Sequence, residues 1–119
     1  MAVVATILVV DDEPQIQRFL KPGLTAGGYD VASAETGQAA VKMIAATAPD
    51  LVILDLGLPD MDGKEVIREV RSWSKVPIIV LSARDREAEK IAALDLGADD
   101  YVNKPVSYTH LTLPTNREV

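Results

Sequence analysis

The sequence predicts an α/β fold, a doubly wound sheet of five parallel strands with helices on both faces. Three runs, 7–10, 51–54 and 78–81, are apolar at every position, which is typical of strands buried on both sides. Two less apolar runs, 29–34 and 100–103, complete the set of expected strands. A helical pattern lies between each pair of successive strands, so right-handed crossovers give a parallel sheet.

The first expected helix follows the first strand. Pro14 suits its first turn, and Asp12 could be its N-cap. Pro22 removes a backbone hydrogen bond and crowds the preceding turn, so we expect a kink or an early end near Lys21. The expected inner face of this helix consists of Ile16, Phe19, Leu20 and Leu24.

Three further helices are expected between the later strands. Thr36 is the expected cap of a helix over 37–46, and further helices begin after Gly63 and within 84–90. Their expected inward residues are Ala40, Val41, Ile44 and Ala45 in the first of these helices, Val66, Ile67 and Val70 in the second, and Ile91, Ala92 and Leu96 in the third.

The composition fits one globular domain of 119 residues and narrows the function classes. Hydrophobic residues make up 48% of the chain, and the net charge of −6 argues against nonspecific nucleic-acid binding. The lack of cysteine excludes disulfides, thiolate metal sites and cysteine catalysis. The apolar stretch 2–10 has no basic leader and is too short to span a bilayer, so we expect a cytoplasmic domain without a membrane anchor.

The last fourteen residues break the pattern. A fifth helix is expected after Pro105, but 106–119 reads VSYTHLTLPTNREV, without an apolar stripe at helical spacing. We therefore divide the chain into a domain over 1–105 and an atypical tail over 106–119, with the fifth helix missing or replaced. A vector-derived tail is the leading interpretation, and an unusual natural terminus is the alternative.

Five polar residues follow strand ends at one edge of the predicted sheet: Asp11, Asp12, Asp55, Ser82 and Lys104. Two carboxylates 4 Å apart repel by about 4 kcal/mol at an effective dielectric near 20. A divalent cation removes that repulsion, and oxygen ligands suit Mg²⁺. With Mg²⁺ and Lys104 neutralising charge, Asp55 could receive a phosphoryl group and Ser82 could donate a hydrogen bond to it.

Each of these residues also has a purely structural interpretation. Asp55 could terminate its strand and cap the following turn, and Asp12 could only cap a helix. Ser82 could be a turn residue and Lys104 a solvated lysine. The functional hypothesis depends on their convergence at one edge rather than on any single residue.

Four motifs in this order, VVDDE, ILDLGLPDMDG, VLSAR and GADDYVNKP, resemble the receiver domain of two-component response regulators over roughly residues 5–105. The resemblance implies a flavodoxin-like (CheY-like) sheet of order 2-1-3-4-5. It implies Mg²⁺ held by Asp11, Asp12, Asp55 and the backbone carbonyl of Gly57. Asp55 would then be the phosphoacceptor that takes phosphate from a sensor histidine kinase.

By the same resemblance, Ser82 and Tyr101 are the switch residues, Lys104 is the family's lysine, and the Lys104–Pro105 peptide is cis. The stretch KIAALDLGADDY resembles the OmpR/PhoB subfamily of transcriptional regulators, in which a DNA-binding domain follows the receiver. In that subfamily the receivers form homodimers, and Lys90, Asp99 and Asp100 match part of the dimer face. The full-length parent is expected to bind DNA, but not through this segment.

We expect this phosphoacceptor switch to take part in its own phosphorylation and dephosphorylation without being a turnover enzyme. Two other functions were considered as alternatives. A phosphatase that forms an aspartyl-phosphate needs a second general acid near the nucleophile, and Gly57 stands two residues after Asp55. A dinucleotide-binding domain needs G-x-G-x-x-G after its first strand, where this chain has acids.

Overall fold

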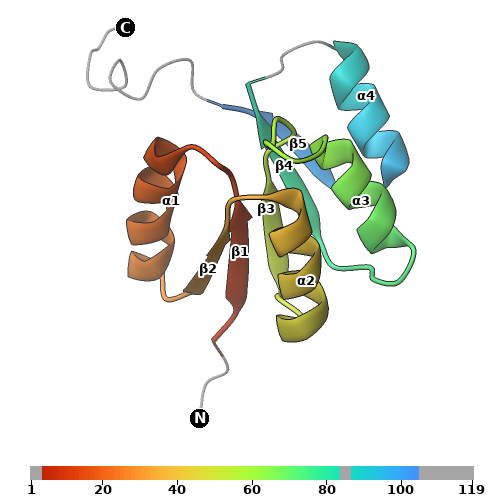
Figure 1. Cartoon of the computed structure of the whole chain (residues 1–119). Coiled ribbons are helices and arrows are strands. Elements are labelled where there is room, and N and C mark those ends of the chain that lie inside the picture. Colours follow the sequence, from red (N-terminus) through yellow and green to blue (C-terminus); the bar gives the residue numbers. More distant parts are fainter. Residues whose placement is uncertain (1–3, 84–86, 105–119) are drawn as a thin grey trace, which may run out of the picture.

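The computed structural model describes residues 4–83 and 87–104 and has the predicted architecture (Figure 1). Five parallel strands form one sheet in the order β2-β1-β3-β4-β5. The strands are β1 (Thr6–Val10), β2 (Asp30–Ala34), β3 (Leu51–Leu54), β4 (Ile78–Ser82) and β5 (Asp100–Asn103). The helices are α1 (Pro14–Ala26), α2 (Gly37–Thr47), α3 (Gly63–Arg71) and α4 (Glu87–Leu96).

The register of the central strands sets their carboxyl ends side by side. Val10 of β1 pairs with Leu54 of β3, and Leu54 pairs with Val80 of β4. The chain leaves β1 toward β2 on one side and reaches β3 on the other side of β1. Ligands of such sheets bind at this switch in strand order, beyond the carboxyl ends.

One face of the sheet carries the main hydrophobic core. Alternate strand residues point to it, and they pack against buried side chains of α2, α3 and α4. Each fully buried aliphatic side chain contributes about 1.5–3 kcal/mol relative to an exposed one. The strand residues of this core include Leu8, Val10, Val52, Leu54, Ile78 and Val80.

The other face carries α1 and is less completely buried in the described residues. Ile7 and Val9 of β1 are buried there, and Ile16 is the buried residue of α1. The corresponding residues of β3 and β4 are half-buried: Leu51, Ile53, Ile79 and Leu81. No helix in the described part of the chain has the length and hydrophobicity that a membrane span needs.

Three predictions about α1 were wrong. Phe19, which was expected on the inner face, is exposed. The helix does not end near Lys21 but continues through Pro22 to Ala26 and closes with bonds from Gly27 N to the carbonyls of Gly23 and Leu24. A proline removes only one helical bond, which the rest of a 13-residue helix tolerates here. The N-cap is Glu13 rather than Asp12, and it makes no side-chain cap bond.

The inward faces of the other helices were predicted correctly in most positions. Thr36 caps α2 by accepting a hydrogen bond from Ala39 N, as predicted. Ala45 and Ile91, however, are exposed, and Ala93 is the buried residue of α4. The errors arose because an apolar residue at helical spacing is turned inward only where a neighbouring element covers it. The predictions for the tail and for the Lys104–Pro105 peptide lie outside the described residues.

Candidate functional site

The sheet itself positions the polar residues that follow its strands. Asp55 N donates to Val10 O at 2.9 Å, and Asp11 N donates to Ala34 O at 3.0 Å. Lys104 N donates to Ser82 O at 2.8 Å. Each bond continues the strand ladder one residue beyond a strand end. The backbone of the site therefore has the rigidity of the sheet rather than that of a free loop.

Lys104 is the cation of this edge. Its Nζ lies 3.0 Å from Asp11 Oδ2, 3.4 Å from Asp55 Oδ1 and 2.6 Å from Glu13 Oε1, and its side chain is only 6% exposed. Burial alone lowers the pKa of Lys104. The hydrogen bonds to Glu13 and Asp11 and the charge of Asp55 outweigh burial and hold that pKa above its usual value. The ammonium group is therefore charged throughout the physiological range.

Asp11 is the carboxylate that the site perturbs most clearly. Burial raises the pKa of Asp11 to about 6, with a smaller contribution from the charge of Asp55. The Glu13 N–H, which donates to Asp11 Oδ1 at 2.9 Å, and Lys104 oppose this rise. The raised pKa therefore reflects mainly the burial of this carboxyl group, which its hydrogen bonds and Lys104 offset only in part.

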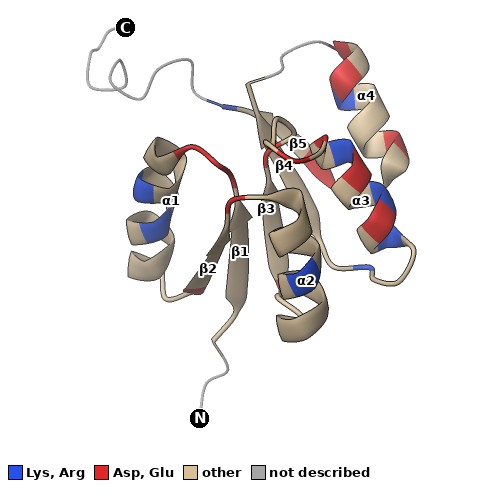
Figure 2. Cartoon of the chain, in the orientation of Figure 1, with Lys and Arg blue, Asp and Glu red and all other residues tan. Residues whose placement is uncertain are grey.

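Three carboxylates converge at this edge with the spacing of a metal site. Oxygen atoms of Asp11, Asp12 and Asp55 all lie within 4.8 Å of one another, and Asp12 is exposed. Figure 2 shows the acidic segment that links β1 to α1 at the carboxyl end of the sheet. Carboxylate oxygens open to water suit Mg²⁺, which takes one or two carboxylates and retains several waters.

A cavity of about 260 Å³ is lined by two of these acids, Asp12 and Asp55. Asp55 is buried but reaches the cavity, so its carboxylate is held firmly and remains accessible to a reactant. This combination of position and access is what a nucleophile requires. The lining residues are Asp12, Glu13, Asp55, Gly57, Ser82, Ala83 and Lys104.

Gly63 allows the loop between β3 and α3 to fold closely against Asp55. A Cβ at position 63 would lie 2.5 Å from Asp55 O and 2.7 Å from Leu56 Cα. Gly63 N donates to Leu56 O at 2.8 Å, and Asp62 caps α3 by accepting from Lys64 N. The chain after Asp55 thus folds back on itself and passes directly into α3.

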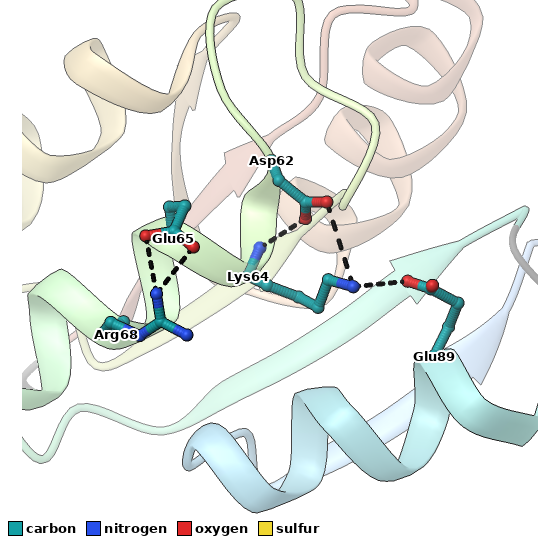
Figure 3. A network of polar contacts seen from close by, with 5 residues as sticks. All are labelled: Asp62, Lys64, Glu65, Arg68 and Glu89. Atoms are coloured by element: carbon teal, nitrogen blue, oxygen red, sulfur yellow. Dashed lines mark hydrogen bonds and ion pairs between the residues drawn. The ribbon is translucent and has the colours of Figure 1, made fainter.

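Polar contacts link the start of α3 to α4, as Figure 3 shows. Lys64 Nζ lies 3.0 Å from Glu89 Oε1 of α4 and 4.0 Å from Asp62 Oδ2. Arg68 and Glu65 form a separate, exposed pair along α3. Such exposed pairs contribute little to stability, about 0–1 kcal/mol. The half-buried Lys64–Glu89 contact ties α4 to the helix that follows the site.

The structure brings six of the predicted site residues together: Asp11, Asp12, Asp55, Gly57, Ser82 and Lys104. Tyr101 does not line the cavity, and its side chain packs in the core. Lys90 and Asp100 are exposed. The Asp99 carboxylate accepts from Ile78 N at 2.8 Å and lies 3.1 Å from Arg71 Nη2 of the same chain.

Sequence reasoning missed two acids, one within the site and one in the loop that follows Asp55. Glu13 binds the Lys104 ammonium, and its place directly after Asp11-Asp12 was the available signal. Asp60 binds the start of α2 through two backbone N–H groups. No local pattern points to Asp60, because its partners are 22 and 23 residues away in the sequence.

Comparison with known proteins identifies the family of this chain. Residues 7–114 match the family described as the response regulator receiver domain. The chain belongs to this family. It is 58% identical over 99 residues to the KDP operon transcriptional regulatory protein KdpE of Escherichia coli (strain K12), and the match covers 83% of this chain and 44% of KdpE. The chain thus spans less than half the length of the curated relatives it matches.

Solved receiver structures share the fold. The BeF3-activated N-terminal receiver domain of Klebsiella pneumoniae RstA matches with a TM-score of 0.81 and 33% identity over 87% of this chain and 89% of that one. The Mn²⁺-bound form of the response regulator Rcp1 matches with a TM-score of 0.80 and 26% identity over 88% of this chain and 84% of that one. The chain is therefore a KdpE-like receiver domain of the OmpR/PhoB type, a phosphoacceptor switch module with a CheY-like fold.

Proposed function

We propose that Asp55 is the phosphoacceptor of this receiver, with Lys104 and Ser82 beside it and a divalent cation held by Asp11, Asp12, Asp55 and the Gly57 carbonyl. One observation carries the proposal. Asp55 is the buried carboxylate that lies 3.4 Å from the Lys104 ammonium and also lines the cavity. A nucleophile in this position approaches the phosphoryl group from a fixed direction.

The proposed reaction forms a bond between a carboxylate oxygen of Asp55 and phosphorus. The bond from phosphorus to a histidine nitrogen of the kinase breaks, and that nitrogen leaves with the electron pair. The Lys104 ammonium offsets negative charge on the transferred group, and the Ser82 hydroxyl donates to one of its oxygens. When bound, Mg²⁺ would neutralise further charge on the phosphoryl oxygens.

The donor set of the site supports Mg²⁺ as the cation. Three carboxylates within 4.8 Å and no histidine or cysteine among them favour a hard, oxygen-seeking ion. A structurally similar receiver, Rcp1, binds Mn²⁺. Mn²⁺ and Mg²⁺ share a preference for oxygen ligands, so we carry the site over to this chain as a magnesium site.

The partners follow from the subfamily. We propose a sensor histidine kinase as phosphodonor and a longer cytoplasmic parent protein that regulates transcription through a DNA-binding domain after the receiver. Dimerisation through Lys90, Asp99 and Asp100 remains a prediction. The comparisons give no support to the phosphatase alternative, and we propose that this domain is a switch rather than a turnover enzyme. The division into a domain over 1–105 and an atypical tail over 106–119, either vector-derived or an unusual natural terminus, also remains a prediction.

The test is phosphorylation of Asp55→Asn. An asparagine keeps the shape of the side chain but is a far poorer nucleophile, so the variant should fold and gain no phosphoryl group. The protein is incubated with a small-molecule phosphodonor and Mg²⁺, and its intact mass is followed with time. Asp50→Asn is the matched control, since Asp50 lies at the opposite edge of the sheet. Equal uptake by wild type and Asp55→Asn would remove Asp55 from this role.

A further inference from the structure

Asp60 ties the loop between β3 and α3 to the start of α2. Its Oδ1 accepts from Gly37 N at 2.7 Å, and its Oδ2 accepts from Gln38 N at 3.0 Å. Thr36 Oγ1 accepts from Ala39 N at 3.0 Å. The first N–H groups of a helix have no partner within the helix. Asp60 therefore supplies two of the three caps that α2 receives, and it does so from a different loop.

An apolar contact lies next to these two hydrogen bonds. A Cβ at Gly37 would meet Met61 Cγ at 2.5 Å and Met61 Sδ at 2.7 Å, so the Met61 side chain occupies the space above Gly37. Met61 also packs against the main core. Asp60 and Met61 thus seat the loop on α2 by adjacent polar and apolar contacts.

The same loop carries two groups of the proposed metal site. Asp55 begins it, and Gly57, whose carbonyl is a proposed ligand, lies three residues before Asp60. Gly57 is exposed, and its pairing with Asp62 is an isolated bridge outside the sheet. Asp60 lies between the two partners of that bridge, so its hydrogen bonds to α2 limit how far this part of the loop can move.

Asp60 accepts these two hydrogen bonds as an ionised carboxylate. Its hydrogen bonds from Gly37 N and then Gln38 N hold the pKa of Asp60 below the usual value for an aspartate. Negative charge at the start of a helix is also favourable to the helix dipole. Asp60 does not line the cavity over Asp55, and it does not belong to the acidic group of Asp11, Asp12 and Asp55. Its influence on the site is therefore indirect.

We infer that Asp60 is a positioning residue of the phosphoacceptor site, which fixes the Gly57 carbonyl by binding the first two N–H groups of α2. This inference rests on the function proposed above. Outer residues that orient metal ligands typically change metal affinity 10–100-fold when removed. We expect Asp60→Ala to weaken Mg²⁺ binding by about tenfold and to slow phosphorylation at limiting Mg²⁺.

The test compares Asp60→Ala with Asp50→Ala. The Asp50 carboxylate also accepts a backbone N–H, from Thr6 at 2.7 Å, but at the far edge of the sheet. Mg²⁺ affinity is measured by calorimetry, and thermal melts with EDTA measure stability alone. Both variants should melt below wild type, and only Asp60→Ala should lose Mg²⁺ affinity. Asp60→Asn keeps one acceptor and should recover part of the affinity. It replaces Asp60→Ala in the comparison if the alanine variant does not fold.

The outcomes separate the two proposals. Wild type that neither binds Mg²⁺ nor takes up phosphate would overturn the proposed function itself. Wild type that does both, beside an Asp60→Ala variant with wild-type Mg²⁺ affinity and a lowered melting temperature, would overturn the positioning role. In that case Asp60 would be a helix cap and nothing more.

Discussion

The two edges of the sheet use aspartate in opposite ways. At the amino edge, Asp50 N donates to Thr6 O and its carboxylate accepts from Thr6 N. Asp99 and Ile78 exchange the same two bonds between β5 and β4. Each acid there makes two hydrogen bonds with the first residue of the neighbouring strand, one through its backbone N–H and one through its carboxylate. At the carboxyl edge, Asp11, Asp12 and Asp55 gather instead around one another and Lys104.

The difference separates acids that stabilise the fold from acids that serve the site. A hydrogen bond to a charged group contributes about 1.5–3 kcal/mol, and neither Asp50 nor Asp99 belongs to the group of three carboxylates that converge within 4.8 Å at the other edge. The carboxyl-edge acids repel one another, and the resulting instability is tolerated where charge is needed for function. If this contrast holds, removal of an acid should lower the free energy of unfolding at the amino edge and raise it at the carboxyl edge when no Mg²⁺ is bound.

The largest expected effect comes from Lys104→Met, which removes the cation and keeps most of the side chain. Asp11 and Asp55 would remain buried without a compensating charge. We expect a loss of about 4 kcal/mol in the free energy of unfolding with EDTA, as is typical when one partner of a buried ion pair is removed. Urea unfolding measures the loss, and Lys21→Met on the exposed side of α1 is the control. A loss below about 1 kcal/mol would mean that the edge is not strained by charge.

Asp99→Ala tests the amino edge. The substitution leaves Ile78 N without its side-chain acceptor. Arg71 loses its contact with the Asp99 carboxylate but keeps the hydrogen bond from its Nε to Gly97 O. We expect a loss of about 2 kcal/mol in the free energy of unfolding, unaffected by Mg²⁺. The same urea experiment with and without Mg²⁺ checks this. A Mg²⁺-dependent change would mean that the two edges are coupled.

The pH dependence of stability tests the strain on Asp11. The pKa of Asp11 is raised from 3.8 to about 6, so the folded state binds this proton more tightly than the unfolded state does. The sign follows: this group destabilises the fold above pH 6, and its penalty disappears as pH falls toward 4. The full shift corresponds to roughly 3 kcal/mol, of which about half, roughly 1.5 kcal/mol, is recovered between pH 7 and pH 5. Unfolding in EDTA between about pH 5 and pH 7 measures this part, with Asp11→Asn as the reference that lacks the Asp11 titration. A parallel pH profile for the two proteins would contradict the prediction.

Asp12→Asn has the smallest expected effect on stability, but the direction of that effect tests the contrast between the two edges most directly. Asp12 is exposed, so relief of repulsion should stabilise the Mg²⁺-free protein by only about 1 kcal/mol. Wild type should be stabilised by millimolar Mg²⁺, because a ligand of the folded state raises its stability, and Asp12→Asn should lose most of that gain. Thermal melts with EDTA and with Mg²⁺ give both values. A variant less stable than wild type in EDTA would place Asp12 with the stabilising acids.

Much of the fold could be predicted from the sequence because its signals are local. Three short runs without a polar residue indicated strands covered on both faces, and in a parallel sheet the polar residues that follow such strands share one edge. The convergence of Asp11, Asp55 and Lys104 follows from this topology alone.

The remaining features depend on contacts that no local pattern encodes. Glu13 meets Lys104 across 91 residues, and Asp60 meets α2 only because the loop after β3 folds toward it. α1 continues through Pro22 because the one backbone hydrogen bond that proline removes is outweighed by the remaining hydrogen bonds and packing of the helix. The exposed Ile91 shows that apolar spacing identifies a helix face without showing whether anything covers it.

The close contact at Gly63 also determines which sequences this loop can accept. Any side chain at position 63 begins with a Cβ that would collide with the backbone of Asp55 and Leu56, and a backbone cannot rotate aside as a side chain can. At Gly57, by contrast, a Cβ would find only Asp55 Oδ2, at 3.8 Å, which is an ordinary contact. If the loop were randomised and selected for phosphate uptake, position 57 should return many residues and position 63 glycine alone. Variation in the loop is thus confined to the residues that leave the peptide of Asp55 in place.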